Sequence, residues 1–481
     1  MRAVNMRLVK ITSWLCLGGL LCSAGWGARA SDPVAELVQP YPVNLLGTPA
    51  NPASVPPTNL PPGSTIIRPG RMGRRLLGPN VRPVEFKEGE RVVLLGDSLI
   101  QREADFGYLE TRMTEEFPER NILFRNLAWD LDNALCRPAK TPDPATDAWF
   151  KQIMAELTVI KPTTVILGYG MGAAAGGEAG LAAFKTNYHR LMEGIRSLDT
   201  NRPVQFILLS PLVHETVPGP VPAPEAHNRQ LLLYTQAVEA MAAEHNDPFI
   251  NLYSWSEAYS QLLSKALQLG QKNVARLTDN GVDLTAYGYS RVTLAFEHFR
   301  TGVHWGGNVW RFGIMSNGSL REGGQGLRVL EYSRDNRHAR VVGLEAMLPS
   351  PFVPGHLDLS TQHQPQCYIQ ITGFEPGRYT LKIDEQPVLT ASETEWARYV
   401  VVGEGPSWAQ AEQLRQAVVQ KNKVFQDRWR PAHAPDAFAA PGAGSKDDPM
   451  HDPLVSQWEG KIATLRVPVK HTFEVVRVGG P

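Results

Sequence analysis

The chain has 481 residues, 43% of them hydrophobic and 20% charged, so its length allows two or three domains with a substantial core. Lys and Arg together number 48, and Asp and Glu also number 48, which gives a formal net charge of zero. This balance argues against a protein that binds nucleic acid or an anionic membrane through its overall electric field.

The first thirty residues predict an export signal. Arg2, Arg7 and Lys10 precede an apolar stretch over residues 11–25, and an A-x-A cleavage motif ends at Ala30. The apolar stretch is short for a membrane span and rich in small residues, so cleavage is favoured over an anchor. We therefore expect a protein that is exported to a periplasm or beyond, with no transmembrane anchor after the signal is removed.

Removal of residues 1–30 would take two of the four cysteines with it. Cys136 and Cys367 become the remaining cysteines, and an oxidising compartment permits them to pair. Two separate buried thiols are an equally good interpretation, because cysteines so far apart in sequence carry no geometric information.

The next segment, residues 31–85, is rich in Pro, Asn and Gly, which predicts an extended linker or a segment draped over another domain.

Short apolar runs alternate with helical periodicity from residue 86 to residue 300. The runs predict five strands, at residues 92–95, 122–127, 164–168, 204–209 and 248–252. Strands that alternate with helices imply right-handed crossovers, and therefore an α/β fold with a parallel, doubly wound sheet.

The C-terminal half has a different pattern of apolar and turn-forming residues. Frequent turns and alternating runs such as RYTLKID predict a small antiparallel β-rich module over residues 301–403. Residues 404–481 predict a pair of helices, separated by a flexible loop at 432–452. Ser407 and Gln410 form a capping-box pattern ahead of the first helix, and Pro431 is expected to end it.

Several tryptophans in this half could form a sugar-stacking platform. Because they are spread over a β module and two helices, core or interface packing is the better interpretation. They are Trp305, Trp310, Trp408, Trp429 and Trp458.

The first predicted strand ends in Gly96-Asp97-Ser98. Ligands of open α/β sheets bind beyond the carboxyl ends of the strands, so Ser98 lies in a suitable place. A serine hydroxyl is a good nucleophile only when a base takes its proton and donors stabilise the oxyanion. The simpler interpretation is that Asp97 or Ser98 caps the helix after the strand.

Four segments, in order, resemble the sequence blocks of the SGNH (GDSL) hydrolase family. GDS resembles the first block, and the other three are RNLAWDLDN (125–133), GYGMG (168–172) and TDNGVDLTAYGY (278–289). The resemblance implies a flavodoxin-like parallel sheet, an esterase-type activity and Ser98 at the nucleophile position. LRQAVVQKNKVFQDRWRP (414–431) resembles the tail of exported SGNH-like proteins common in planctomycete-type bacteria.

The same resemblance identifies departures at the catalytic positions. The family forms its oxyanion hole with the nucleophile serine, a Gly N–H and an Asn side chain; the matching positions here are Ser98, Ala128 and Gly172. Asp283 occupies the position of the catalytic histidine. Asn280 stands where the family has its acid, with Asp279 one residue earlier.

These departures predict impaired catalysis. Losing one oxyanion donor typically costs about 10² to 10³ in turnover, whereas losing the triad histidine can cost on the order of 10⁶. A carboxylate is a much weaker base than imidazole near neutral pH, and its charge opposes a nearby oxyanion. The residues therefore favour a degenerate esterase-like protein that binds a ligand or partner on the exported side. Whether it is an enzyme stays open.

The alternative is an active hydrolase of carbohydrate or acyl esters that uses Ser98 with a surrogate base. His214 follows the fourth predicted strand and is the best candidate for that base. Expected partners are an acylated carbohydrate or another exported protein, and no nucleic acid. No cofactor or metal is predicted, because GYGMGAAAGGEAG lacks the ending of a P-loop and Asp279 with Asp283 has no His or Cys at ligand spacing.

Overall fold

The computed structural model describes residues 84, 86–129, 145–199, 201–218, 224–270, 275–301, 310–323, 326–351, 353, 367–433 and 452–479. The predicted signal, most of the linker, Cys136, Trp305 and residues 434–451 of the predicted loop lie outside these ranges. The possible pairing of Cys136 with Cys367 therefore stays a prediction. Cys367 itself is fully buried, and this burial raises the pKa of its thiol well above the usual value.

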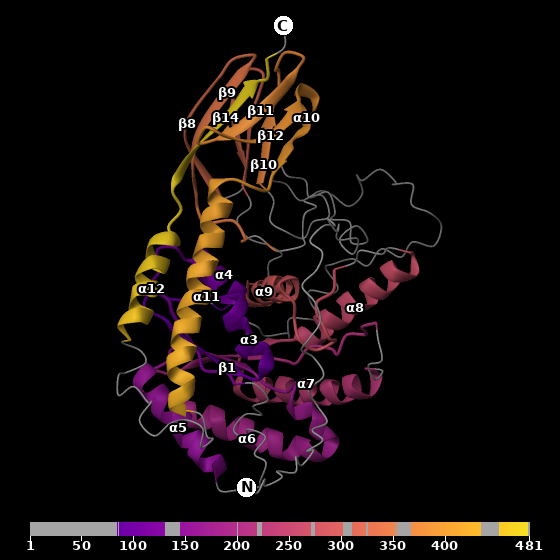
Figure 1. Ribbon diagram of the computed structural model, residues 1–481, viewed down its shortest axis with the longest axis vertical. Helices are drawn as coiled ribbons and strands as arrows, with labels where there is room; N and C mark the ends of the chain where they lie inside the picture. The colour runs from indigo at the N-terminus through magenta and orange to yellow at the C-terminus, as the bar shows by residue number, and fades with distance from the viewer. Residues whose placement is uncertain are drawn as a thin grey trace, which may run out of the picture.

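A five-stranded sheet forms the centre of the α/β domain (Figure 1). Its order is β2-β1-β3-β4-β5, and every pair is parallel. This is the flavodoxin-like order, so the predicted fold class is confirmed. The strands are β1 (Arg91–Gly96), β2 (Leu123–Asn126), β3 (Thr164–Gly168), β4 (Gln205–Leu209) and β5 (Phe249–Ile250).

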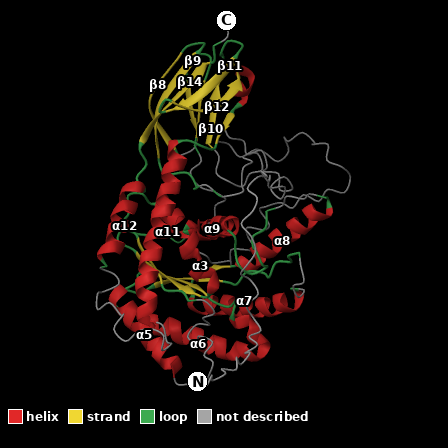
Figure 2. Ribbon diagram, viewed as in Figure 1, coloured by secondary structure: helices red, strands yellow, loops and turns green. Residues whose placement is uncertain are grey.

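Helices cover both faces of this sheet (Figure 2). Successive strand residues point to opposite faces, so Val93 and Leu95 join one buried cluster while Val92 and Leu94 join the other. The first cluster contains residues of α5 (Ala145–Ile160), α6 (Gly177–Ser197) and α7 (Glu225–His245), and the second those of α3 (Ser98–Phe106), α4 (Tyr108–Glu116), α8 (Leu252–Gln268) and α9 (Ala286–Thr301). Every strand is therefore buried on both sides.

The β module consists of two sheets around one shared core (Figure 2). Their orders are β13-β10-β6-β7 and β12-β11-β14-β9-β8. The elements are β6 (Arg311–Ile314), β7 (Leu320–Gly323), β8 (Leu327–Arg334), β9 (His338–Glu345), β10 (Cys367–Ile371), β11 (Arg378–Ile383), β12 (Gln386–Ser392), α10 (Glu393–Arg398), β13 (Val400–Val402) and β14 (Lys470–Arg477).

Two predictions about this module are wrong. The module is not wholly antiparallel, because β6 and β10 pair in parallel. Residues 404–481 do not form only a helical pair, because β14 returns to the module and lies between β11 and β9. The alternation in β14 was visible in the sequence, where His471, Phe473 and Val475 are the buried positions. Its partner strands lie far upstream, so no local pattern indicated where it pairs.

The C-terminal helices pack on the α/β domain. Helix α11 (Pro406–His433) runs from the β module along α3 and α4, and α12 (Pro453–Leu465) lies beside it (Figure 1). Two ion pairs tie them to the domain: Lys421 Nζ lies 2.6 Å from Glu110 Oε1, and Arg125 Nη1 lies 2.6 Å from Glu459 Oε1. The predicted helical pair is confirmed, and it forms part of the α/β body.

The predicted ends of α11 are wrong. The helix starts at Pro406, and Ser407 Oγ donates to Glu345 Oε1 at 2.9 Å, outside any capping box. Gln410 Nε2 donates to carbonyls of Leu465 and Val467, at the end of α12. The helix also continues past Pro431.

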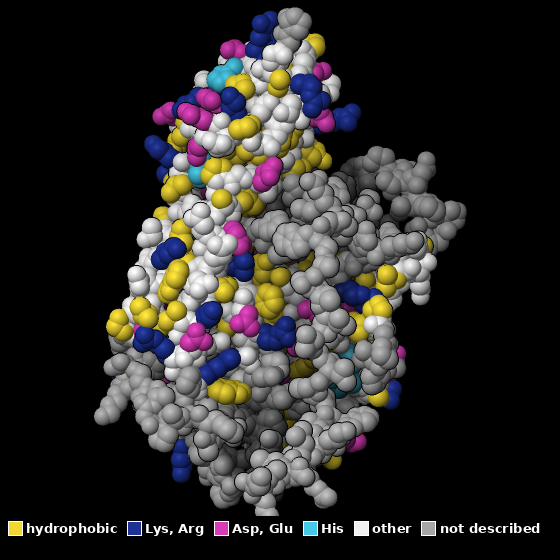
Figure 3. Space-filling model, in the orientation of Figure 1, with side chains coloured by type: hydrophobic (Ala, Val, Ile, Leu, Met, Phe, Trp, Pro, Cys, Tyr) yellow, Lys and Arg dark blue, Asp and Glu magenta, His cyan; other side chains and the backbone are white. Residues whose placement is uncertain are grey.

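The tryptophans pack as expected from the sequence. Trp310 and Trp429 are buried in cores, as predicted, and Trp408 and Trp458 pack against core clusters. On the face shown in Figure 3, acidic and basic side chains are interspersed over the described parts of the β module and of α11 and α12. Within the described residues, no helix has both the length and the apolar character needed to cross a bilayer.

Candidate functional site

The turn between β1 and α3 places Ser98 at the first position of a helix. Asp97 is the N-cap of α3, and its Oδ1 accepts a hydrogen bond from the Leu99 N–H at 3.3 Å. Its Oδ2 accepts from the N–H groups of Met171 and Gly172, at 2.9 and 3.3 Å. This buried carboxylate, 1% exposed, therefore joins the ends of two neighbouring strands. The capping role is confirmed for Asp97.

The same turn requires glycine at the ends of β1 and β3. A Cβ at Gly96 would lie 2.4 Å from the Gly168 carbonyl oxygen and 2.6 Å from Ile100 Cγ1. A Cβ at Gly168 would lie 2.5 Å from the same Ile100 atom. The two strand ends can approach α3 so closely only because neither carries a side chain.

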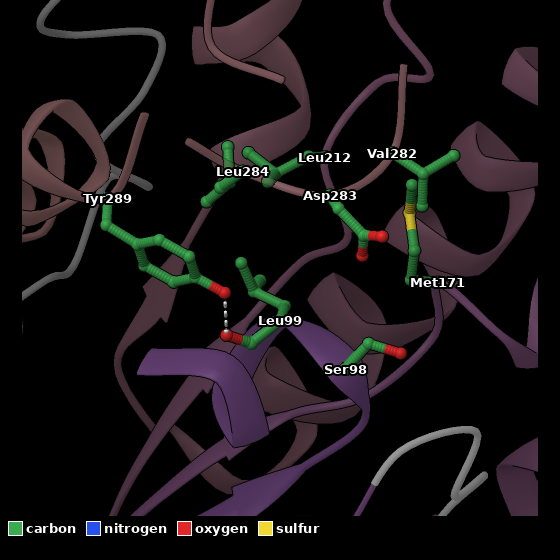
Figure 4. Close-up of a pocket in the computed structure, with 8 residues that line it drawn as sticks. All are labelled: Ser98, Leu99, Met171, Leu212, Val282, Asp283, Leu284 and Tyr289. Atoms are coloured by element: carbon green, nitrogen blue, oxygen red, sulfur yellow. Dashed lines mark hydrogen bonds between the residues drawn. The ribbon is translucent and has the colours of Figure 1, made fainter. Parts of the chain in front are cut away.

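A small pocket opens above Ser98, with about 300 Å³ of empty space that is partly open to solvent (Figure 4). The enclosed part holds only about 10 Å³, room for about one water molecule, so a larger ligand would bind at the open side or displace side chains of the lining. Apolar side chains form most of the wall, and three residues bring polar groups. The lining residues are Ser98, Leu99, Met171, Leu212, Val282, Asp283, Leu284 and Tyr289.

Asp283 shares this pocket with Ser98, as the sequence predicted, and its carboxylate is held by two donors. Arg102 Nη1, one turn after Ser98 on α3, lies 2.7 Å from Asp283 Oδ2, and Asn280 Nδ2 donates to the same oxygen at 2.9 Å. The Asp283 side chain is 30% exposed. A carboxylate bound in this way is an acceptor and a fixed negative charge, and it faces the Ser98 side of the pocket (Figure 4).

Asn280, at the position of the family's catalytic acid, and Asp279 beside it belong to the loop that carries Asp283. Asn280 Oδ1 accepts from the N–H groups of Val282 and Asp283, at 3.0 and 2.8 Å, which forms an Asx turn. Asp279 is exposed, donates its N–H to the Asp283 carbonyl oxygen at 3.0 Å, and is not among the described residues that line the pocket. The structure therefore does not bring Asp279 to Ser98.

At Ala128 and Gly172, the two predicted oxyanion-hole positions outside the β1–α3 turn, the backbone N–H groups are engaged within the protein. The Ala128 N–H donates to Asn126 Oδ1 at 3.0 Å, and Ala128 is 1% exposed. The Gly172 N–H donates to Asp97. Asn126 is itself fixed, because its Nδ2 donates to the Ile100 carbonyl at 2.7 Å. Sequence reasoning missed this role of Asn126, although the residue lies within the second block.

His214 is not among the described residues that line the pocket and belongs to a pair of histidines. Its Nδ1 is 3.2 Å from Nδ1 of His227 on α7. Its backbone N–H and C=O both bond to the Asn228 side chain, at 2.7 and 3.0 Å. Burial lowers the pKa of both imidazoles, and for His227 the neighbouring His214 lowers it further. His227 was not singled out from the sequence.

The histidine pair supports the loop that carries Asp283. A Cβ at Gly281, where φ is +94°, would lie 2.7 Å from the His214 ring and from the Glu215 carbonyl oxygen. The buried Glu215 carboxylate accepts from the Thr278 N–H and hydroxyl, at 2.9 and 2.6 Å. Burial raises the pKa of Glu215. These contacts give His214 a positioning role for the loop.

Tyr289 closes the far wall of the pocket. Its hydroxyl donates to the Leu99 carbonyl at 2.9 Å (Figure 4), and burial raises its pKa well above the usual value. The phenol is therefore neutral at physiological pH and is used for packing and for this bond.

Comparison with solved structures finds proteins of similar fold. The chain is similar to BT4096, a gut microbial diltiazem-metabolizing enzyme, with a TM-score of 0.66 and 14% identity over 83% of this chain and 99% of that one. Axe2, an acetylxylan esterase from Geobacillus stearothermophilus, aligns with a TM-score of 0.33 and 15% identity over 45% of this chain and 96% of its own. The acetyl xylan esterase AlAXEase aligns with a TM-score of 0.30 and 15% identity over 43% of this chain and 97% of its own.

No protein-family model matches the sequence, and no curated protein matches it. The likeness to BT4096 extends over more of the chain than the α/β domain alone, so the two proteins share their general architecture. At 14% identity this likeness shows the fold. The chain therefore has a flavodoxin-like α/β fold joined to a β module and C-terminal helices.

Proposed function

We propose that the protein is an exported, SGNH-hydrolase-like member of planctomycete type in which ester hydrolysis is impaired and the Ser98 pocket binds a ligand. The observation that carries this proposal is the position of Asp283. Its carboxylate lies in the pocket with Ser98 and is bound by Arg102 and Asn280. A triad serine needs an imidazole there to take its proton.

The donor pattern supports the same proposal. A tetrahedral intermediate needs N–H groups directed at the developing oxyanion. The N–H groups of Ala128 and Gly172 donate to internal acceptors, and Gly172 has no side chain with which to replace the family's Asn. The Asp283 charge would also oppose an oxyanion formed at Ser98. Transition-state stabilisation is therefore expected to be weak.

The lining of the pocket indicates which ligands it favours. A carboxylate and a hydroxyl among apolar walls accept hydrogen bonds from neutral donors such as sugar hydroxyls, and the carboxylate disfavours anions. An acylated carbohydrate would present hydroxyls and an apolar acyl group together. The apolar, cleavable N-terminus supports export, and another exported protein is the second class of partner.

The direct test is activity-based labelling of the mature chain. We expect that a fluorophosphonate probe does not label Ser98 and that a chromogenic acetate ester is not hydrolysed above the rate of a matched Ser98→Ala variant. Circular dichroism would show that both proteins are folded. Titration with acetylated oligosaccharides should give binding that weakens in Asp283→Ala.

Ser98-dependent hydrolysis in the wild type would overturn the proposal and favour the active-enzyme alternative. The variant His214→Ala then decides the mechanism. A surrogate base requires that this activity be lost, and retained activity would exclude His214 from that role.

A further inference from the structure

A second cluster of ligand-type side chains lies between helices α6 and α7. His189, Glu244 and His245 each offer one ligand atom, and these three atoms lie within 4.8 Å of one another. His189 Nε2 is 3.7 Å from Glu244 Oε2. The rings of His189 and His245 have centroids 5.9 Å apart and stand at 67° to each other. Two imidazoles and a carboxylate therefore converge from two helices.

The backbone that carries these side chains is held by the core. Beneath the cluster, α6 contributes Tyr188 and Met192 to a buried cluster, and α7 contributes Met241 and Ala242. His245 is the last residue of α7, which ends in Asn246 with a left-handed backbone. The carbonyl end of a helix carries partial negative charge and favours a cation. Asp247 adds a carboxylate nearby, paired with Arg196 at 2.6 Å.

We propose that His189, Glu244 and His245 form a binding site for a divalent transition metal of the zinc class. Imidazole with one carboxylate is a ligand set that suits Zn²⁺, whereas Mg²⁺ and Ca²⁺ require more oxygen ligands. In a tetrahedral zinc site with bonds of about 2.0 Å, neighbouring ligand atoms lie roughly 3.3 Å apart. Water takes the fourth position.

To reach that geometry, side-chain rotations must bring the three ligand atoms closer together. The Glu244 side chain is 61% exposed and His189 is 30% exposed, so both can rotate without disturbing the core. The metal would link α6 to the end of α7 as a cross-brace.

This site is independent of the Ser98 pocket. None of its three residues is among the pocket residues, and α7 leads from the carboxyl end of β4 back to the start of β5. The end of α7 therefore lies at the amino-terminal ends of the strands, whereas Ser98 lies at their carboxyl-terminal ends. Sequence analysis predicted no metal and did not consider these residues, since His189 lies too far along the chain from Glu244 and His245 to form a spacing motif.

The test uses the mature chain without an affinity tag, stripped with chelator and titrated with zinc chloride at pH 7.5. We expect one zinc ion per chain, a higher Tm with zinc than with chelator, and the absorption of a four-coordinate complex when cobalt replaces zinc. His189→Ala and His245→Ala should each weaken binding by about ten-fold or more, which corresponds to about 1.4 kcal/mol.

His227→Ala is the matched control, because His227 belongs to the other close histidine pair, with His214. It should leave zinc binding unchanged. Failure of the folded wild type to bind zinc stoichiometrically, or undiminished binding by a His189→Ala, His245→Ala double variant, would overturn the proposal. So would loss of binding in His227→Ala alone. The wild type and every variant are compared in chelator by circular dichroism, so that a folding defect is not mistaken for lost ligation.

Discussion

The two sides of the Ser98 pocket are built in different ways. On the β1–α3 side, Asp97 is 1% exposed and accepts three backbone N–H groups, and Gly96 has no room for a side chain. On the opposite side, Asp283 is 30% exposed and is bound by Arg102 and Asn280 at the surface of a loop. The first set of contacts is needed by the fold whether or not the protein catalyses a reaction. The second set can change while the fold persists.

This difference means that a GDS turn can serve the fold without any catalytic role. Asp97 and Gly96 are retained for capping and packing, and Ser98 fits the first turn of a helix with or without a chemical role. A GDS turn therefore predicts the fold well and indicates catalysis weakly. The following measurements test this view, from the largest expected effect to the smallest.

Gly96→Ala should destabilise the fold most, by about 3 kcal/mol or more, because the new methyl group would overlap the Gly168 carbonyl and Ile100. Urea denaturation at pH 7 gives the free energy of unfolding. Gly460→Ala in the exposed face of α12 is the matched control, since a methyl group there would meet no other part of the protein within 4 Å. It should be neutral or stabilising, by up to about 1 kcal/mol. Equal effects at the two positions would contradict the packing argument.

Asp97→Ala should cost about 2 kcal/mol, because it removes an N-cap and leaves two partly buried N–H groups without their acceptor. Asp97→Asn keeps one acceptor oxygen and should cost less. Ser98→Ala serves as the comparison in the same turn. If Ser98→Ala destabilised the protein more than Asp97→Ala, the structural role assigned to Asp97 would be wrong.

Asp283→Ala should change the free energy of unfolding by less than about 1 kcal/mol, because partly exposed ion pairs contribute little. The same denaturation experiment in high salt should shrink the effect further, since salt screens such pairs. A loss above about 2 kcal/mol would mean that this side of the pocket is as essential to the fold as the β1–α3 side.

The smallest effect is a pH dependence of stability from His214 and His227. Burial lowers the pKa of both in the folded protein below the ordinary value of 6.5, so the unfolded chain takes up protons first as the pH falls. Their contribution is complete above pH 6.5 and is lost as the pH falls through the lowered values. Glu215, whose pKa is raised, changes the stability in the opposite direction as the pH falls. It is present in both the wild type and the double variant described next, so its effect cancels in their comparison.

A His214→Gln, His227→Gln double variant should therefore lose less Tm than the wild type between pH 7.5 and about pH 5. Parallel Tm curves for the two proteins would show that the pair does not titrate with folding.

Much of the fold could be predicted from local patterns. Alternation of short apolar runs with helical periodicity predicted all five strands of the α/β sheet, and Ser98 was expected just past the first strand, where it lies. The β14 strand was missed as part of the β module, since its pairing partners are remote in sequence. Ser407 misled the prediction of where α11 starts, because its hydroxyl bonds to Glu345, and the helix continues past Pro431 to His433.

Some features of the candidate site could likewise be predicted from the sequence, and others could not. The identities at its key positions, with aspartate at 283 and glycine at 172, follow from the sequence alone, as does the order of strands and helices. Only the tertiary structure decided that the Ala128 N–H turns to Asn126, that His214 pairs with His227, and that Arg102 binds Asp283. Periodicity is set by neighbours along the chain, whereas each N–H, ring or carboxylate takes whichever partner folding brings within about 3 Å.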